Sequence, residues 1–228
     1  MSLYKQATGF IIHQRKFKNS SQIIEFFSKE FGKFQFIAKG IDKNKQLFSQ
    51  IQLFSLSKIE FYGNSNLKSL ATINILENLS FKDLLLKTSA LYLNELIHLS
   101  VLENENVELL FNAYQQAIKS LGDQKLAIVL RKFEWQLLKN NGFEITIDEN
   151  SKPEEWLAIN DNYDLSVQSC SKNAQCQVAD LQKFIEGNIL NKESLKRLNR
   201  FIEKAVSISL SHRKIYSKEL IKSISRFS

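Results

Sequence analysis

Alternating apolar and polar residues predict several short strands in the first third of the chain. Successive side chains of a strand point to opposite faces, so Ile11 and His13 are expected on the same face of the first strand. A polar, lysine-bearing loop is predicted over residues 41–50, between the third and fourth strands. The five strands predicted in this way cover residues 9–18, 23–27, 34–38, 51–61 and 67–75.

Five short antiparallel strands of this spacing fit a small barrel of the OB type, whose open face and loops commonly bind nucleic acid. An SH3-like barrel fits the spacing nearly as well. Glycines stand where turns are expected, with Gly32 between the second and third strands and Gly63 before the fifth. The sequence therefore predicts a small β-barrel at its N-terminal end.

After about residue 80, the apolar residues recur with a helical period, and short connections between the helices favour a bundle. Gly122 is expected to end the second helix, Asp123 to cap the third, and Gly142 to end the third. The apolar stripes of these three helices consist of Leu84, Leu85, Leu91, Tyr92, Leu96 and Leu99; of Val107, Leu110, Phe111, Tyr114, Ala117, Ile118 and Leu121; and of Leu126, Val129, Leu130, Phe133 and Leu137.

Residues 143–178 have no helical period and contain the chain's only proline, Pro153, which predicts a small strand-bearing insertion. The predicted fold class is therefore α+β. An OB-fold, nucleic-acid-binding domain is expected in residues 1–78, and an α-helical bundle domain that carries the insertion in residues 79–228. Further helices are expected at residues 179–186, 192–210 and 217–224.

Composition narrows the class of protein. The chain has 228 residues, of which 43% are hydrophobic and 24% are charged, enough for one large or two small folded domains. It contains no apolar run long enough to predict a membrane span, and its N-terminus lacks the pattern of a signal peptide. Cys170 and Cys176 are too few for a disulfide scaffold. These features favour the cytoplasm.

Charge is distributed unevenly along the chain. Residues 1–70 contain 11 Lys and Arg against 4 Asp and Glu, residues 71–191 contain 10 against 17, and residues 192–228 contain 10 against 3. Lysine content alone is weak support for a function, because the base composition of an AT-rich genome also raises it. Such a bias does not explain the segregation, and two basic ends indicate an anionic partner at one or both of them.

Aromatic residues are interleaved with lysines in the predicted barrel, where residues 8–61 contain 10 of the chain's 17 phenylalanines. A β module with a cationic face and exposed rings suits a phosphate backbone and unstacked bases. The alternative is a phenylalanine-rich core beneath a solvated lysine surface. Both interpretations remain open from the sequence.

Signatures of enzymes and metal sites are missing. The chain lacks the common phosphate-binding glycine loops, the GxSxG nucleophile motif and the HExxH zinc motif. His13, His98 and His212 are far apart in sequence and are interpreted as surface or packing residues. Cys170 and Cys176 have no second pair or nearby histidine to complete a zinc site. We therefore expect no catalytic residue, no metal and no cofactor.

Several segments, taken in order, resemble the bacterial recombination mediator family RecO. GFIIHQRKF, FIAKG and QLFSLSKIEFYG are similar to that family's N-terminal barrel. LYLNELIHLSVLENENVELLFNAY and LRKFEWQLLKNNGFE are similar to its helical core. The resemblance runs from about residue 9 to about residue 144 and rests on the order of the segments, because no single motif is diagnostic.

The resemblance implies a non-enzymatic DNA-repair protein that binds single- and double-stranded DNA and anneals complementary strands. With RecR, such a protein helps RecA load onto DNA coated by single-stranded-DNA-binding protein (SSB). Several relatives carry four cysteines in the insertion as a zinc module, which this chain lacks. The resemblance places DNA contact at residues that the charge pattern also singles out, namely Arg15, Lys16, Lys18, Lys33, Lys39, Lys43 and Lys45.

Arg131, in the LRxFE segment, is the candidate for binding the acidic, Phe-ended C-terminal tail of SSB, which members of the family hold in the helical domain. A guanidinium can bind a carboxylate bidentately beside an apolar pocket. The alternative is an ion pair with Glu134 at i,i+3 of the same helix. The sequence supports the two interpretations equally.

The basic C-terminal stretch also has two interpretations. It could extend the path of the DNA, or it could be the solvated face of two amphipathic helices, which the pattern slightly favours. The residues concerned are Lys196, Arg197, Arg200, Lys204, Arg213, Lys214, Lys218, Lys222 and Arg226.

Two hypotheses from different classes follow. The first is a recombination mediator that binds DNA electrostatically and anneals strands without nucleotide hydrolysis. The second is a protein–protein adaptor whose helical domain captures acidic peptide tails, with the barrel as scaffold. Charge reversal at Lys39, Lys43 and Lys45 separates them, because only DNA binding depends on these residues. A third hypothesis, an unrecognised nuclease, predicts metal-dependent cleavage of DNA.

Overall fold

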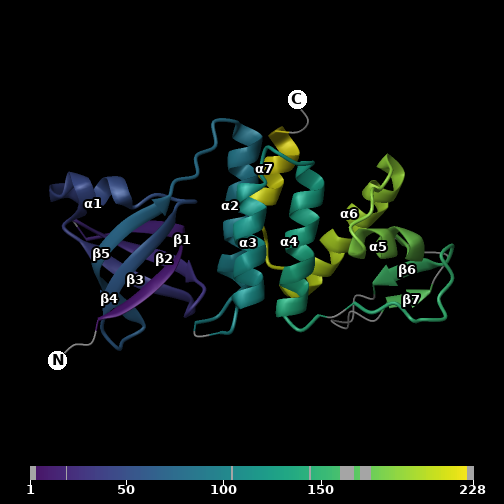
Figure 1. The fold of residues 1–228 in the computed structure, drawn as a ribbon, viewed down its shortest axis with the longest axis horizontal. Coiled ribbons are helices and arrows are strands. Elements are labelled where there is room, and N and C mark those ends of the chain that lie inside the picture. Colours follow the sequence, from purple (N-terminus) through teal and green to yellow (C-terminus); the bar gives the residue numbers. More distant parts are fainter. Residues whose placement is uncertain are drawn as a thin grey trace. The chain divides into compact units, whose positions relative to one another are not determined.

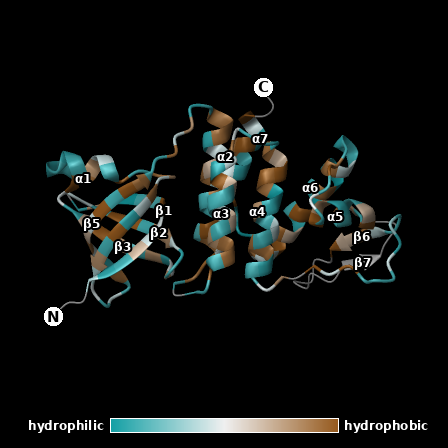
Figure 2. Ribbon diagram, viewed as in Figure 1, coloured by the Kyte–Doolittle hydropathy of each residue, from teal (hydrophilic) through white to brown (hydrophobic). Residues whose placement is uncertain are grey.

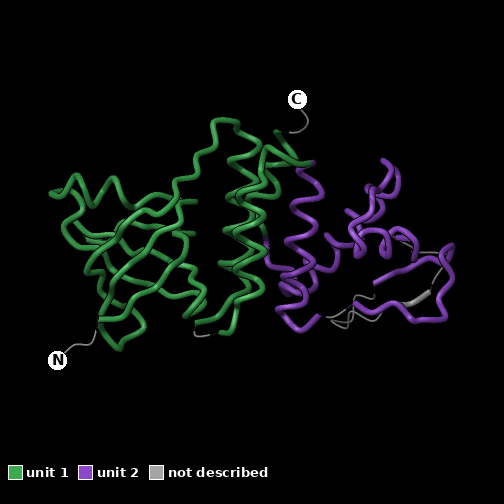
Figure 3. The backbone as a smooth tube through the Cα atoms, in the orientation of Figure 1, with its two compact units in different colours: residues 1–124, 215–228 green, residues 125–214 purple. Residues whose placement is uncertain are grey.

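The computed structural model describes residues 4–18, 20–103, 105–143, 145–159, 167–169 and 176–224, with only the backbone described at 167–169. The chain divides into two compact units, Met1–Gln124 with Ile215–Ser228, and Lys125–Lys214 (Figure 3). The predicted change from strands to helices near residue 78 falls inside the first unit. That unit therefore combines all the strands of the barrel with several helices.

The first unit contains a closed five-stranded barrel of the predicted OB type (Figure 1). Its strands are β1 (Lys5–Phe17), β2 (Ser21–Ser28), β3 (Gly32–Lys39), β4 (Leu56–Tyr62) and β5 (Leu67–Glu77). The order around the barrel is β1-β2-β3-β5-β4. Neighbouring strands pair antiparallel except β3 and β5, which pair in parallel. The prediction of an OB-type barrel is confirmed.

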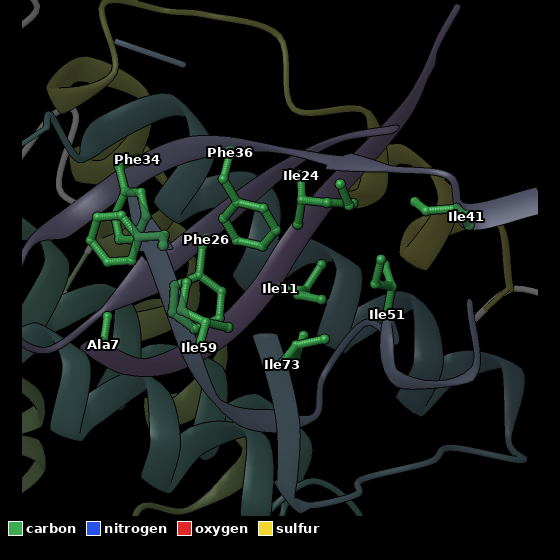
Figure 4. Close-up of a cluster of buried hydrophobic side chains, with 12 residues drawn as sticks. Ala7, Ile11, Ile24, Phe26, Phe34, Phe36, Ile41, Ile51, Ile59 and Ile73 are labelled. Carbon is green, nitrogen blue, oxygen red and sulfur yellow. The ribbon is translucent and has the colours of Figure 1, made fainter. Parts of the chain in front are cut away.

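Apolar side chains from all five strands fill the barrel (Figure 4). Burying one phenylalanine ring contributes about 1.5–3 kcal/mol to the stability of the fold. The core interpretation therefore accounts for most of the aromatic residues of this region. Of the ten phenylalanines in residues 8–61, seven are buried, namely Phe10, Phe26, Phe27, Phe34, Phe36, Phe54 and Phe61.

A β-bulge in β1 interrupts the alternation that the sequence predicts. The pairing with β2 passes from Ile11 opposite Phe26 to His13 opposite Glu25, so that Ile12 is an extra residue. Ile11 belongs to the barrel core, whereas His13 is exposed. The prediction that Ile11 and His13 share a face is wrong, because the extra residue inverts the alternation between them.

The segment predicted as a loop over residues 41–50 is largely helical. It forms a short 3-10 turn, η1 (Ile41–Lys43), followed by the helix α1 (Lys45–Gln50). Asn44 caps this helix, because its side-chain oxygen accepts a hydrogen bond from the backbone N–H of Leu47 at 3.0 Å. The side chain of Leu47 packs against the barrel core, which seats α1 on the barrel.

The strand β4 begins at Leu56, five residues later than predicted. Phe54 has a φ angle of 69°, which lies outside the extended region and prevents the strand from continuing toward Ile51. Ile51 is nevertheless buried in the barrel core, and Leu53 packs against it. The apolar residues at the start of this segment therefore belong to the core, but the prediction of a strand there is wrong.

The helix α3 (Glu108–Lys119) covers part of the outer face of the barrel. The ring of Phe10 in β1 lies 5.1 Å from that of Tyr114, and the ring of Phe27 in β2 lies 5.5 Å from that of Phe111. All seven residues of the stripe predicted for this helix are buried. The adjoining residues of β1 and β2 are thus closed to any ligand.

The other two helices of the first unit, α2 (Leu84–Ser100) and α7 (Tyr216–Ile224), pack on each other. The carboxylate of Glu95 in α2 accepts hydrogen bonds from the backbone N–H groups of Tyr216 and Ser217, both at 2.9 Å. A carboxylate at this position is favoured by the dipole at the N-terminus of a helix. The predicted stripe of α2 is wrong at Leu84, which is 61% exposed.

The described residues of the second unit form three helices and a small sheet. The helices are α4 (Leu126–Asn140), α5 (Val178–Ile185) and α6 (Lys192–Ser209), and the sheet has the order β7 (Val167–Ser169), β6 (Trp156–Ile159) and β8 (Cys176–Gln177). The predicted strand-bearing insertion is confirmed.

The two ends of α4 differ in how well they were predicted. Gly142 follows the helix with a positive φ of 77°, as expected for a residue that ends it. The predicted N-terminal cap, Asp123, is wrong, because Lys125 occupies the cap position and makes no side-chain hydrogen bond there.

Candidate nucleic-acid interface

The pairing of β1, β2 and β3 brings three strand ends together at one end of the barrel. Phe17 in β1 pairs with Ser21 in β2, which pairs in turn with Lys39 in β3. Neighbouring strands lie about 4.8 Å apart, so this row places Phe17 and Lys39 about 10 Å from each other. Beyond β3, the backbone N–H of Ile41 donates to the carbonyl of Ser20 at 2.9 Å, which holds η1 against the same end.

Six of the seven predicted DNA-contacting residues lie near this end of the barrel, on β1, β3, η1 and α1 or directly after β1. Each of the six is exposed, and none forms an ion pair within the part of the chain that the structure describes. Asp42 in η1 is an exposed acidic residue beside them. We call the six residues the barrel-end patch; they are Arg15, Lys16, Lys18, Lys39, Lys43 and Lys45.

The seventh predicted residue, Lys33, lies near the opposite end of β3, where it pairs with Phe27. Its ammonium group donates to the carbonyl of His98 at 2.5 Å and lies 3.7 Å from a carboxylate oxygen of Glu25. Its side chain is only 18% exposed. The structure therefore separates Lys33 from the barrel-end patch and gives its charge a partner inside the protein.

Glu25 is the centre of this polar cluster and is almost completely buried. Burial alone raises the pKa of its carboxyl, but the hydrogen bond with His98 and the charge of Lys33 outweigh that effect. The pKa of Glu25 is therefore lowered below its ordinary value. Sequence spacing did not reveal the cluster, in which the rings of His13 and His98 also lie 5.7 Å apart.

Arg131 lies in the second unit, with a side chain that is only 6% exposed. Its guanidinium lies 2.7 Å from Glu134, and its Nη1 donates to the backbone carbonyl of Asn199 at 3.3 Å and lies 3.8 Å from Glu203. The ion pair with Glu134 that the sequence offered as an alternative is present. Arg131 thus links α4 to α6 inside this unit.

Arg197, a residue of the basic C-terminal stretch, also has an acidic partner inside the second unit. Its guanidinium donates to the carboxylate of Asp180 at 2.6 Å and lies 5.6 Å from the ring centre of Trp156. Burial disfavours the charged form of Asp180, but the bonds from Arg197 outweigh it and lower the pKa of that carboxyl. Arg226 lies outside the described residues, so the path of the DNA along this stretch stays a prediction.

Cys176, the one cysteine among the described residues, does not fit a zinc ligand. Cys176 is buried, and burial, reinforced by the negative charge of Asp180, raises the pKa of its thiol to about 12, whereas a zinc ligand must be a thiolate. Cys170 lies outside the described residues. Among the described residues, no three His, Cys, Asp or Glu side chains lie together as a metal site.

No helix in the described part of the chain is long and apolar enough to cross a membrane.

Two family models match the chain. Recombination protein O N terminal matches residues 1–79, and Recombination protein O C terminal matches residues 82–219. The chain belongs to the RecO family. The first model ends just after β5 of the barrel and the second begins just before α2, so the family's own division falls where strands give way to helices.

Relatives named DNA repair protein RecO match nearly the whole chain. The one from Actinobacillus pleuropneumoniae serotype 5b (strain L20) is 27% identical over 226 residues, which cover 95% of this chain and 94% of the relative. The one from Idiomarina loihiensis is 26% identical over 231 residues, covering 96% and 98%. Membership of the RecO family supports a role in recombination and DNA repair.

Proposed function

We propose that this RecO-family protein is a non-enzymatic recombination mediator that binds single- and double-stranded DNA at the barrel-end patch. The observation that carries the proposal is the gathering of six exposed cations at one end of the barrel, without an acidic partner in the described part of the chain. Lys29, Lys33, Lys68 and Lys119 each have an acidic partner, whereas the six patch residues have none among the described residues. Unpaired cations gathered on one surface are available to neutralise phosphates.

Annealing follows from the same electrostatics. Two complementary strands repel each other through their phosphates, and a cationic surface that binds both lowers that repulsion. Because the patch binds phosphates and not base edges, the base edges stay free to pair. No nucleotide hydrolysis is needed for this mechanism, and the proposal includes none.

The salt dependence of binding tests the proposal quantitatively. If about six phosphates are neutralised, the affinity for duplex DNA falls about a thousandfold between 50 and 200 mM salt. Charge reversal of Lys39, Lys43 and Lys45 to Glu should abolish annealing and flatten the salt dependence. A matched control reverses Lys58, Lys82 and Lys87, which are exposed lysines of the same unit outside the patch. Equal loss in both triple variants, or a flat salt dependence of the unmodified protein, contradicts the proposal.

The partners belong to the proposal as well. We infer that the protein acts in the cytoplasm with RecR to help RecA load onto SSB-coated single strands. For the tail of SSB, Arg131 stays the proposed contact under one condition. A tail carboxylate reaches the guanidinium only by taking the place of Glu203, which is 32% exposed and 3.8 Å from Nη1.

The role of Glu203 can be tested without removing Arg131. Glu203→Gln removes the competing negative charge and should tighten the binding of a peptide with the acidic, Phe-ended sequence of the SSB tail. The measurement is a titration of labelled peptide by fluorescence anisotropy. Unchanged affinity would place the tail elsewhere and leave Arg131 with a structural role alone.

A further inference from the structure

We propose that Phe48, exposed on α1 within the barrel-end patch, is a base-stacking residue that makes this surface prefer single-stranded nucleic acid to duplex. The proposal rests on the proposed function and adds to it the feature that discriminates between the two forms. Phosphate neutralisation alone does not favour single strands, because a duplex has the higher charge density.

The exposure of Phe48 is unusual for this barrel. Its side chain is 61% exposed, whereas seven of the other nine phenylalanines in residues 8–61 are buried. The neighbouring residue Leu47 packs against the barrel core, so α1 turns Leu47 inward and leaves Phe48 in solvent. An exposed aromatic ring beside a cluster of cations is available to contact a ligand.

The backbone of Phe48 is held in α1. The N–H of Phe48 donates to the carbonyl of Asn44 at 3.0 Å, and Asn44 also caps the helix. The polar character of most of α1 (Figure 2) agrees with a helix that holds Leu47 toward the barrel. Stacking a base on the ring therefore orders only the side chain, because the backbone is already in place.

The charges around Phe48 favour an anionic ligand. Lys43 and Lys45 are exposed on the same short segment, and no Asp or Glu occurs from residue 43 to residue 59. The remaining cations of the patch lie on β1, directly after it and on β3, so the positive charge is spread over several elements. A polyanion with flat apolar faces matches this arrangement, and unstacked bases on a phosphate backbone have both properties.

A second aromatic residue lies within the patch. Phe17 at the end of β1 is half-buried, and the ammonium group of Lys18 lies 5.5 Å from its ring centre. Phe17 therefore exposes less of its ring than Phe48, and the ammonium group of Lys18 already lies over that ring. Phe48 is the residue on which the preference for single strands is expected to depend.

Selectivity follows from the availability of base faces. In a duplex, each base is already stacked between its neighbours, so Phe48 gains a partner only if the duplex is opened. In a flexible single strand, a base can turn onto the ring without that cost. Stacking on an aromatic side chain is worth about 1–3 kcal/mol per base, equivalent to about a 5- to 150-fold change in affinity.

The test compares Phe48→Ala, Phe48→Leu and Tyr4→Ala in the full chain. Tyr4 is an aromatic residue of matched exposure, 62%, that precedes β1 at the opposite end of that strand. Affinities for an unstructured oligothymidine and for a duplex of equal length are measured by fluorescence anisotropy at low salt. Thermal unfolding of each variant establishes that the fold is kept.

Phe48→Ala is expected to weaken binding to oligothymidine about 5- to 150-fold while leaving the duplex within about twofold. Phe48→Leu should lose most of the same preference, and Tyr4→Ala should lose none. An unchanged affinity of Phe48→Ala for oligothymidine, or an equal loss for both ligands, overturns the stacking role while the proposed function stands. If the unmodified protein binds neither ligand, the proposed function itself fails.

Discussion

The barrel-end patch and the buried ion pair of α4 both contain basic residues that the sequence singles out, but their surroundings differ. The patch cations are exposed and have no acidic partner among the described residues, whereas Arg131 is buried beside Glu134. A buried cation needs its partner to offset the loss of hydration, while an exposed one keeps its hydration until a ligand replaces it. Availability to a ligand is therefore decided by the environment of a charge and not by its position in a motif.

The same contrast occurs within a single strand. Lys33 and Lys39 both belong to β3 and lie about 20 Å apart along it. Lys33 is held by Glu25 and by the carbonyl of His98, whereas Lys39 is exposed at the barrel-end patch. Two lysines of one strand thus contribute to different properties, one to the stability of the fold and the other to the charge of its surface.

The largest effect is expected for Arg131→Ala, which removes the partner of a buried carboxylate. Loss of one member of a buried ion pair costs about 3–5 kcal/mol. Chemical denaturation should therefore reveal a marked loss of stability. The neighbouring Lys132 is exposed, and Lys132→Ala should change the free energy of unfolding by less than about 0.5 kcal/mol.

A double replacement sharpens this prediction. Arg131→Met combined with Glu134→Leu removes both charges and should recover most of the stability that Arg131→Ala loses, because apolar residues of similar volume need no charged partner. If Arg131→Ala is as stable as the unmodified protein, the difference between the two regions is smaller than the structure indicates. Arg131 would then be as available to a ligand as the patch cations.

A smaller effect with a defined pH dependence is expected for Glu25→Gln. The substitution should cost about 1–3 kcal/mol at pH 7, since it weakens the bonds that Glu25 forms with Lys33 and His98. Because the pKa of Glu25 is lowered in the folded protein, its charged form stabilises the fold above the unfolded-state value of about 4.3. That contribution is lost as the pH falls through the folded-state pKa.

The stability difference between Glu25→Gln and the unmodified protein should therefore shrink as the pH falls below about 4.3. Urea denaturation at a series of pH values measures it. The exposed pair of Glu108 with Lys29 provides the control, because Glu108→Gln removes only a solvent-screened charge and should cost much less stability than Glu25→Gln. A stability difference between Glu25→Gln and the unmodified protein that stays constant with pH would contradict the assigned role of Glu25.

The smallest effect is expected for Asp42→Asn, which removes the exposed acidic residue beside the patch. DNA affinity should rise about two- to fivefold at low salt and by less at high salt, because exposed charges are screened. Asp123→Asn changes an exposed aspartate outside the patch and should have no effect on binding. A similar gain in both variants would mean that only net charge matters.

Much of the barrel could be predicted from the sequence, because apolar residues at every second position identify strands facing a core. The bulge at Ile12 could not, since one extra residue leaves the composition of β1 unchanged. The helix α1 was missed because six residues with only Leu47 packed inward are too short to establish a helical period. The positive φ angle of Phe54 similarly has no signature in residue type.

The candidate site was predictable only in part, because strand pairing decides which residues meet. Charge segregation identified the basic segments, and the pairing of β1, β2 and β3 gathers six of the seven residues. Lys33 is separated because its partners, Glu25 and His98, come from other elements. For Arg131, Glu134 was visible three residues away, but its contact with Asn199 joins residues 68 positions apart.

The bonds between Glu95 and the first residues of α7 have a consequence for biosynthesis. The chain leaves the first unit after residue 124 and returns at residue 215, so the whole second unit is synthesised before the segment that completes the first (Figure 3). A nascent chain can close its barrel early, but α2 lacks its neighbour α7 until residues 215–224 have been made. The packing of α7 on α2 is therefore expected to be a late step in the folding of the first unit.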